Sequence, residues 1–247
     1  TLRGKFSIQE HWTGDQTYFF ITRSGGYSYT EKMWSSSLAD LFNQAPDNAH
    51  FLFISMKDKD GTDNHLKHIE GMKKKFDEVV LKMSKKSRRH WKRHVHFVTD
   101  RVPMSDDQPA PDIASGWLGD MTRTRGRFCF SIDRFQRERD CGNVSWPPTG
   151  TNSTQVLWTL AFLGRHYDFE YDRAQKMAKE KVTELTFVDA KSTYSELVRY
   201  VEFPGVAEMK TYDHLEVDLN INLPNHLGQY GPWYHNMMHL SLCDLPS

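Results

Sequence analysis

Short apolar segments alternate with amphipathic ones through the first half of the chain. Apolar runs of the kind that a sheet buries lie at Thr17–Arg23, His50–Met56 and His94–Asp100. Between them, apolar residues recur at helical spacing over Glu31–Ala45 and again from about Asn64 to Ser87. Strands and helices that alternate in this way form parallel strands joined by crossover helices. We therefore predict an α/β fold, with a sheet and packed helices in two or three layers.

The pattern changes in the second half of the chain. Strand-like sequence resumes at Gly126–Arg134 and at Ser153–Gly164, and a short helix then leads to a predicted strand at Val182–Val188. These segments extend the predicted α/β domain over residues 1–190. Polar and apolar residues then alternate along Tyr212–Leu223, which is typical of a half-buried antiparallel strand. Residues 191–247 are therefore predicted to form a β-rich and incomplete segment.

The predicted strand at Tyr212–Leu223 has an apolar face and an edge that must be covered. With the sequence at Asn236–Asp244 it makes a pair of strands, and two strands alone bury too little apolar surface to be stable. An open edge also pairs readily with another strand. We therefore expect a partner at this edge, either another protein chain or the remainder of a larger precursor.

The charge balance and the lengths of the apolar runs limit the kinds of partner that we expect for this chain. The 247 residues include 32 Lys and Arg and 32 Asp and Glu, so no overall field attracts nucleic acid. No apolar run approaches the roughly 20 residues that cross a bilayer. We expect neither a nucleic-acid partner nor a transmembrane segment in this chain.

One stretch departs from this balance, the basic run "KKSRRHWKRH" at Lys85–His94. It is a candidate site for a sulfated glycan or another anion. The alternative is a solvated helix end whose charges complement the helix dipole. The candidate anion-binding residues are Lys85, Lys86, Arg88, Arg89, Lys92 and Arg93.

The cysteines and the glycosylation motifs bear on whether the protein is secreted or cytosolic. Cys129 and Cys141 flank a short loop that a disulfide could close, and Asn143 and Asn152 each begin an Asn-X-Ser/Thr acceptor. Together they favour a secreted or luminal glycoprotein with a Cys129–Cys141 disulfide. The alternative is a cytosolic protein with reduced, inert cysteines. Cys243 has no evident partner.

Motifs for nucleophilic catalysis, nucleotide binding and zinc binding are missing from the sequence. Histidine pairs do occur, but without the spacing or the cysteines of a zinc site, and they are explained as surface or core residues. We therefore expect no cofactor and no metal. These pairs are His65 and His68, His94 and His96, and His235 and His239.

The segment Val201–Asp244 contains "TYDHLEVDLNI", Pro224-Asn225, Trp233 and "MHLSLCD". In these features it resembles the opening of the N-terminal jelly-roll domain of peptide-N-glycosidase F and its relatives, here preceded by an α/β domain. The resemblance covers about a fifth of the chain. It implies an amidase or glycosidase that acts on glycoproteins and that carries a catalytic acid directly after the tryptophan.

The sequence departs from that family where the chemistry lies. Tyr234 stands in place of the acid, and the two cysteines of the family correspond to Leu223 and roughly to Tyr230. A phenol with a pKa near 10 is a poor general base at neutral pH. We therefore expect no catalytic residue in this chain and a structural, assembly or ligand-binding role. The alternatives are a glycoprotein-directed amidase completed by residues outside this chain, and a sulfated-glycan binder.

Overall fold

The structure is a computed structural model of the chain. It describes residues 1–23, 28–56, 64–102, 129–141, 154–180, 183–186, 201–213, 215 and 217. The chain divides into two units, Thr1–Glu180 and Lys181–Ser247. The predicted division, which fell at residue 190, stays a prediction.

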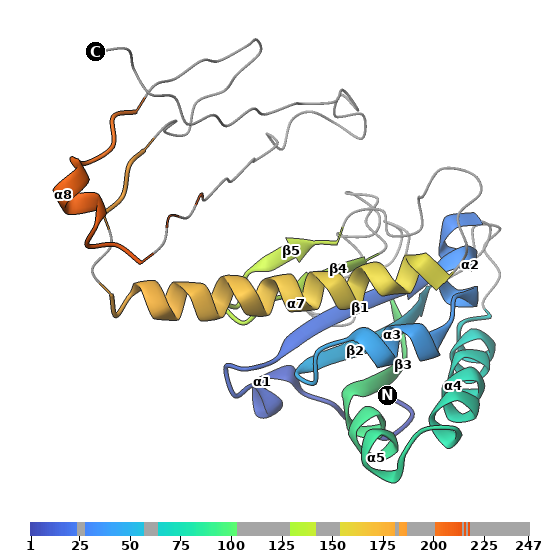
Figure 1. Cartoon of the computed structure of the whole chain (residues 1–247). Coiled ribbons are helices and arrows are strands. Elements are labelled where there is room, and N and C mark those ends of the chain that lie inside the picture. Colours follow the sequence, from blue (N-terminus) through green and yellow to red (C-terminus); the bar gives the residue numbers. More distant parts are fainter. Residues whose placement is uncertain are drawn as a thin grey trace. The chain divides into compact units, whose positions relative to one another are not determined.

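The first unit contains a mixed sheet of five strands, in the order β3-β2-β1-β4-β5 (Figure 1). β1 (Thr17–Arg23), β2 (Ala49–Met56) and β3 (Val95–Val102) are parallel. β4 (Cys129–Ile132) runs antiparallel to β1, and β5 (Glu138–Asp140) runs antiparallel to β4. The sheet and its packed helices confirm the predicted α/β fold, with the three predicted strands side by side.

Helices cover one face of this sheet. They are α2 (Ser28–Ser35), α3 (Leu38–Gln44), α4 (His65–Leu81), α5 (Lys85–His94) and α7 (Thr154–Met177). Crossovers of one hand that step in one direction along a sheet place their helices on the same face, as the order β1, β2, β3 does here. The strand residues of this apolar core include Phe19, Phe51, Phe53 and Phe97, and the helices contribute Leu41, Phe76, Trp91 and Leu160, all of them buried. We call this the helix-covered face.

The second face of the sheet carries a smaller apolar cluster. Its buried residues are Tyr18, Phe20, Leu52, Ile54, Met56 and Phe130. Residues 1–12, which include the single-turn helix α1 (Ile8–His11), supply Phe6, Ile8 and Trp12 to pack against it. Within the ranges that the structure describes, these three are the apolar side chains that reach this cluster from outside the sheet.

Two predicted helices are each divided into two. The helix expected over Glu31–Ala45 breaks at Ser37, whose hydroxyl accepts the amide of Asp40 at 3.3 Å and so begins α3. The helix expected from Asn64 to Ser87 ends at Leu81, and Ser84 begins α5 in the same way. Serine competes with the helical hydrogen bonds of its neighbours, which is why it favours the first position of a new helix.

The strand predicted at Ser153–Gly164 was wrong, because these residues lie almost entirely in α7, a helix of 24 residues. The buried positions Leu157, Leu160, Ala161, Gly164 and Tyr167 recur three and four residues apart, on one side of the helix. Gly164 lets α7 approach the segment that follows α3, since a Cβ there would lie 3.1 Å from the Pro46 ring. A short apolar run by itself does not distinguish a buried strand from a buried helix.

The second unit is described over few residues. Its helix α8 spans Val206–Met209, and the Tyr212 hydroxyl donates to Glu208 Oε1 at 2.9 Å. Residues 183–186, inside the predicted strand at Val182–Val188, form neither helix nor strand. The predicted strand at Tyr212–Leu223 lies mostly outside the described residues, as do Trp233, Tyr234 and Cys243.

Candidate functional site

The basic run predicted as a candidate site forms α5, which its own sequence fixes at both ends. The Ser84 hydroxyl accepts the Ser87 amide at 3.1 Å at the start of the helix. The Val95 amide bonds the Trp91 carbonyl where the helix gives way to β3. Trp91 is 3% exposed, and its ring stacks on Phe42 of α3 with centroids 4.8 Å apart. Burial of this tryptophan turns the opposite side of α5 outward.

Five basic residues occupy that outward side, and we call them the basic face of α5. They lie at successive positions of one helical stripe, so their side chains project from the same side. All are exposed. Across the described ranges, no carboxylate forms an ion pair with any of them. The residues are Lys85, Lys86, Arg89, Lys92 and Arg93.

Arg88, the sixth candidate, does not belong to this face. Its Nε donates to the Val80 carbonyl at 3.0 Å, and its Nη2 donates to Leu81 at 2.7 Å and to Met83 at 3.3 Å. These carbonyls lie at the end of α4, where a helix leaves its last acceptors unpaired. Arg88 therefore closes α4 with two of its three guanidinium nitrogens.

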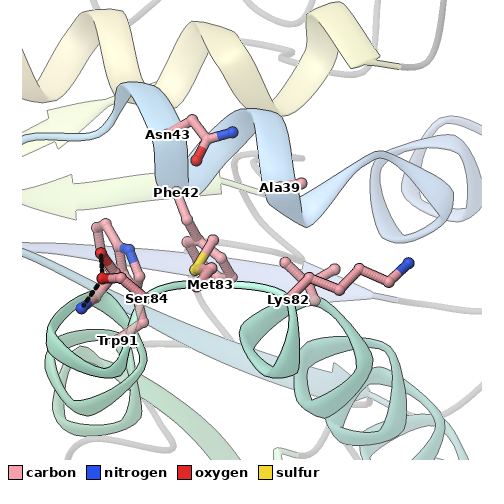
Figure 2. Close-up of a pocket in the computed structure, with 9 residues that line it drawn as sticks. Ala39, Phe42, Asn43, Lys82, Met83, Ser84 and Trp91 are labelled. Atoms are coloured by element: carbon pink, nitrogen blue, oxygen red, sulfur yellow. Dashed lines mark hydrogen bonds between the residues drawn. The ribbon is translucent and has the colours of Figure 1, made fainter.

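A cavity of about 360 Å³ lies beside the first turn of α5. Figure 2 shows Phe42 extending from α3 toward Met83 and Trp91, and these three side chains line the apolar part of the cavity. Ser84 lies on the α5 side of the cavity. The first turn of α5 has no acidic residue, so the positive end of its dipole is not compensated there. The complete lining is Ala39, Phe42, Asn43, Val79, Lys82, Met83, Ser84, Ser87 and Trp91.

An ionic network joins the β4–β5 turn to α7. The side chain of Asp133 is 1% exposed and accepts the amides of Phe135 at 3.0 Å and Arg137 at 2.9 Å. Arg137 Nε also donates to it at 3.0 Å, and Arg139 Nη1 lies 2.9 Å from Glu170 Oε2 on α7. A carboxylate with both oxygens engaged holds a turn in place and is poorly placed to act as a general base. Sequence reasoning missed this network, because it depends on contacts between distant segments.

The predicted disulfide between Cys129 and Cys141 is not formed in the structure, where both are buried free thiols. The β4–β5 register nevertheless brings them together. Phe130 pairs with Asp140 and Ser131 with Arg139, so the next pair of opposite positions is Cys129 and Cys141. Both thiols belong to the helix-covered face. The predicted glycosylation sites, Asn143 and Asn152, lie outside the described residues.

The histidine pairs that were explained as surface or core residues lie in different parts of the chain. His65 and His68 lie in α4, and His235 and His239 are beyond the described ranges. His94 ends α5 and His96 lies in β3, where they meet His50 and His90. A search of the described part of the chain finds no group of three or more His, Cys, Asp or Glu side chains arranged to hold a metal ion.

Comparison with protein-family models, with curated proteins and with solved structures finds no match for this chain. Across the part of the chain that the structure describes, no helix is both long and apolar enough to cross a bilayer. A function can therefore be inferred only from the chemistry of the described residues.

Proposed function

We propose that this chain is a non-catalytic, ligand-binding part of a secreted or luminal glycoprotein, and that its α/β domain binds sulfated glycans through the basic face of α5. The observation that carries the proposal is the concentration of five exposed and unpaired cations on one side of one helix. The whole chain has no net charge, so this face is a local positive field. A flexible polyanion is the kind of ligand that such a field attracts.

The burial of the aromatic ring of α5 favours a glycan over single-stranded nucleic acid. Proteins that bind single strands combine basic grooves with exposed aromatic rings on which the bases stack. The aromatic residue of α5 is Trp91, which is buried at 3% exposure and cannot serve as such a platform. The five cations also span about 12 Å along the helix, at 1.5 Å per residue, which suits the repeated charges of a linear sulfated chain.

The helix dipole does not account for all of these charges. Cations stabilise the last turn of a helix, which holds Lys92 and Arg93. Lys85 and Lys86 lie in the first turn, where the same dipole makes a cation unfavourable. An anion bound near this turn would offset that cost.

Assembly through the strand edge at Tyr212–Leu223, and the alternative of a peptide-N-glycosidase-like amidase, remain predictions. The residues that carry them lie mostly or wholly outside the described ranges. Release of glycans from a glycopeptide by the purified chain would favour the amidase.

Heparin affinity tests the proposed binding. The variant Lys85→Gln/Arg89→Gln/Lys92→Gln removes three cations from the basic face, and the control Lys67→Gln/Lys74→Gln/Lys179→Gln removes three exposed cations elsewhere. We expect heparin binding at 150 mM salt to weaken roughly tenfold in the first variant, because exposed charges contribute a few tenths to one kcal/mol each. The control should bind within about twofold of wild type. Equal losses in both variants, or a lack of wild-type binding, would contradict the proposal.

A further inference from the structure

Five histidines from four elements gather where β2 and β3 begin, and we call them the histidine cluster: His11, His50, His90, His94 and His96. The ring of His90 stacks on His94 at 4.0 Å, and His94 lies 4.3 Å from His50. His50 and His96 are nearly parallel, with centroids 5.4 Å apart. Phe6 continues the row, at 3.9 Å from His96 and 4.8 Å from His11.

The centre of the cluster is a contact between two imidazoles. His50 Nδ1 lies 3.1 Å from His96 Nε2, and each residue is 8% exposed. In such a contact one nitrogen must donate a proton and the other must accept it. If both rings are protonated, the acceptor is lost and two positive charges face each other away from water. The pair therefore cannot take up two protons, and its burial disfavours the uptake of even one.

The charged groups around the cluster also disfavour protonation. Arg3 lies near His96, Lys86 of α5 lies near His90, and Arg93 of α5 lies near both His90 and His94. The carboxylate near them is that of Asp47, before β2. Its Oδ1 is 3.9 Å from His90 Nε2, and its side chain is 98% exposed, so its compensation is weak.

Burial is the main cause of the resulting pKa shifts. Desolvation, together with the neighbouring histidines, lowers the pKa of His50 to about 3. Desolvation, together with Arg3 and the neighbouring histidines, lowers the pKa of His96 to about 3. Tyr18, whose ring is 4.7 Å from His50, stays neutral because burial raises its pKa to about 12.

The cluster also anchors residues 1–12 on the second face of the sheet. The Phe6 ring rests on His96, and the Leu2 amide donates to the Phe97 carbonyl at 3.0 Å. Trp12 stacks on Tyr18 with centroids 5.7 Å apart. Separation of His96 from His50 would therefore disturb the attachment of the segment that covers this face.

We propose that the histidine cluster is an acid-sensitive latch, which holds residues 1–12 on the sheet at neutral pH and releases them in a mildly acidic compartment. Release would uncover the apolar cluster around Tyr18, Phe20 and Leu52. This inference does not depend on the glycan-binding proposal.

The sign of the pH effect follows from proton linkage. A released histidine has a pKa near 6.5, so below that pH the released state binds protons that the closed state excludes. The closed state, in which residues 1–12 lie on the sheet, is therefore fully favoured above pH 6.5. It loses stability relative to the released state as the pH falls toward 3. At pH 5.5 each excluded proton multiplies the opening equilibrium constant about elevenfold, and two multiply it about a hundredfold.

Hydrogen exchange of the full chain at pH 7.4 and 5.5, corrected for intrinsic rates, tests the latch. We expect amide protection in residues 1–12 to fall about a hundredfold at pH 5.5. The variant His50→Phe/His96→Phe keeps two stacked rings that cannot titrate, and its protection should change less than about threefold. The control His166→Phe replaces an exposed histidine of α7 and should respond like wild type.

If circular dichroism shows that the double variant does not fold, the variant His96→Gln and an NMR titration of the wild-type protein are used in its place. His96→Gln should weaken the acid response by about tenfold, because one excluded proton is removed. In wild type, two histidine ring signals should stay neutral at pH 7.4 and titrate only below pH 6.5, together with the loss of protection in residues 1–12. Protection of residues 1–12 that is equal at both pH values would overturn the proposal. An unchanged acid response in the variants, or ring signals that all titrate near pH 6.5, would overturn it as well.

Discussion

The two faces of the sheet are covered by different kinds of structure. On the helix-covered face, aromatic and aliphatic side chains from several helices meet Phe19, Phe51, Phe53 and Phe97. On the second face, the described cover is the segment 1–12, which rests partly on titratable rings. Both faces are apolar, so apolar character alone does not set their response to acid.

The difference lies in what must break for each face to open. Exposing the helix-covered face requires the helices to leave the sheet, which amounts to unfolding the domain. On the second face, residues 1–12 can detach from the described sheet while the helices stay in place, and local openings of this kind cost less free energy than global unfolding. Acid should therefore act first on the second face.

The largest effect is expected for Phe51→Ala on the helix-covered face. Phe51 is fully buried, with its ring 5.4 Å from Phe19 and 6.1 Å from Trp91. Its truncation leaves a cavity, and we expect a loss of about 3–5 kcal/mol in the free energy of unfolding by urea. The loss should be the same at pH 7.4 and 5.5, because the aromatic rings that it contacts, those of Phe19, Phe42 and Trp91, carry no group that titrates in that range.

The control for this measurement is Phe169→Ala, the same substitution at a site on α7 that is 62% exposed. It should change the free energy of unfolding by less than about 0.5 kcal/mol. A loss at Phe51 that shrinks markedly at pH 5.5 would mean that the helix-covered face also opens in acid, and the contrast between the faces would fail.

A smaller and pH-dependent effect is expected for Phe6→Ala on the second face. Phe6 is half-buried and contacts His96 and His11. We expect a loss of about 1–2 kcal/mol in the free energy of unfolding at pH 7.4, in line with partial burial of one aromatic ring. At pH 5.5 the loss should be smaller, because the segment is already released in much of the population. Equal losses at both pH values would show that acid does not free this segment.

The sequence predicted the parts of the fold that depend on local pattern. The strands predicted at Thr17–Arg23, His50–Met56 and His94–Asp100 are short and largely apolar runs, and they lie in one sheet as expected. The short helix predicted after Gly164 lies in the second half of α7, but the first half was predicted as a strand because its residues form an apolar run that suits a strand equally well. Its helical spacing becomes evident only when Tyr167 is included.

The candidate site was predicted in part. The basic run at Lys85–His94 is visible in the sequence, but the role of Arg88 depends on the break between α4 and α5. The sequence pattern could not predict the histidine cluster, since His50 and His96 are 46 residues apart. Their contact is set by the parallel pairing of β2 with β3, which brings Leu52 opposite His96.

The smallest effect concerns the thiols of the helix-covered face. Cys129 and Cys141 are 1% and 6% exposed, and both are packed in its core. In a reduced Cys243→Ser variant we expect them to react with a disulfide reagent only through global unfolding. Their reaction rate, relative to that of the unfolded chain, should therefore report the same free energy as urea unfolding at both pH values. Amides of residues 1–12 should report a lower free energy at pH 5.5. Thiols that react in acid as readily as those amides exchange would place both faces in one cooperative unit. Cysteines that do not react even in urea, and that react only after a reductant is added, would instead reveal the Cys129–Cys141 disulfide that the sequence predicts.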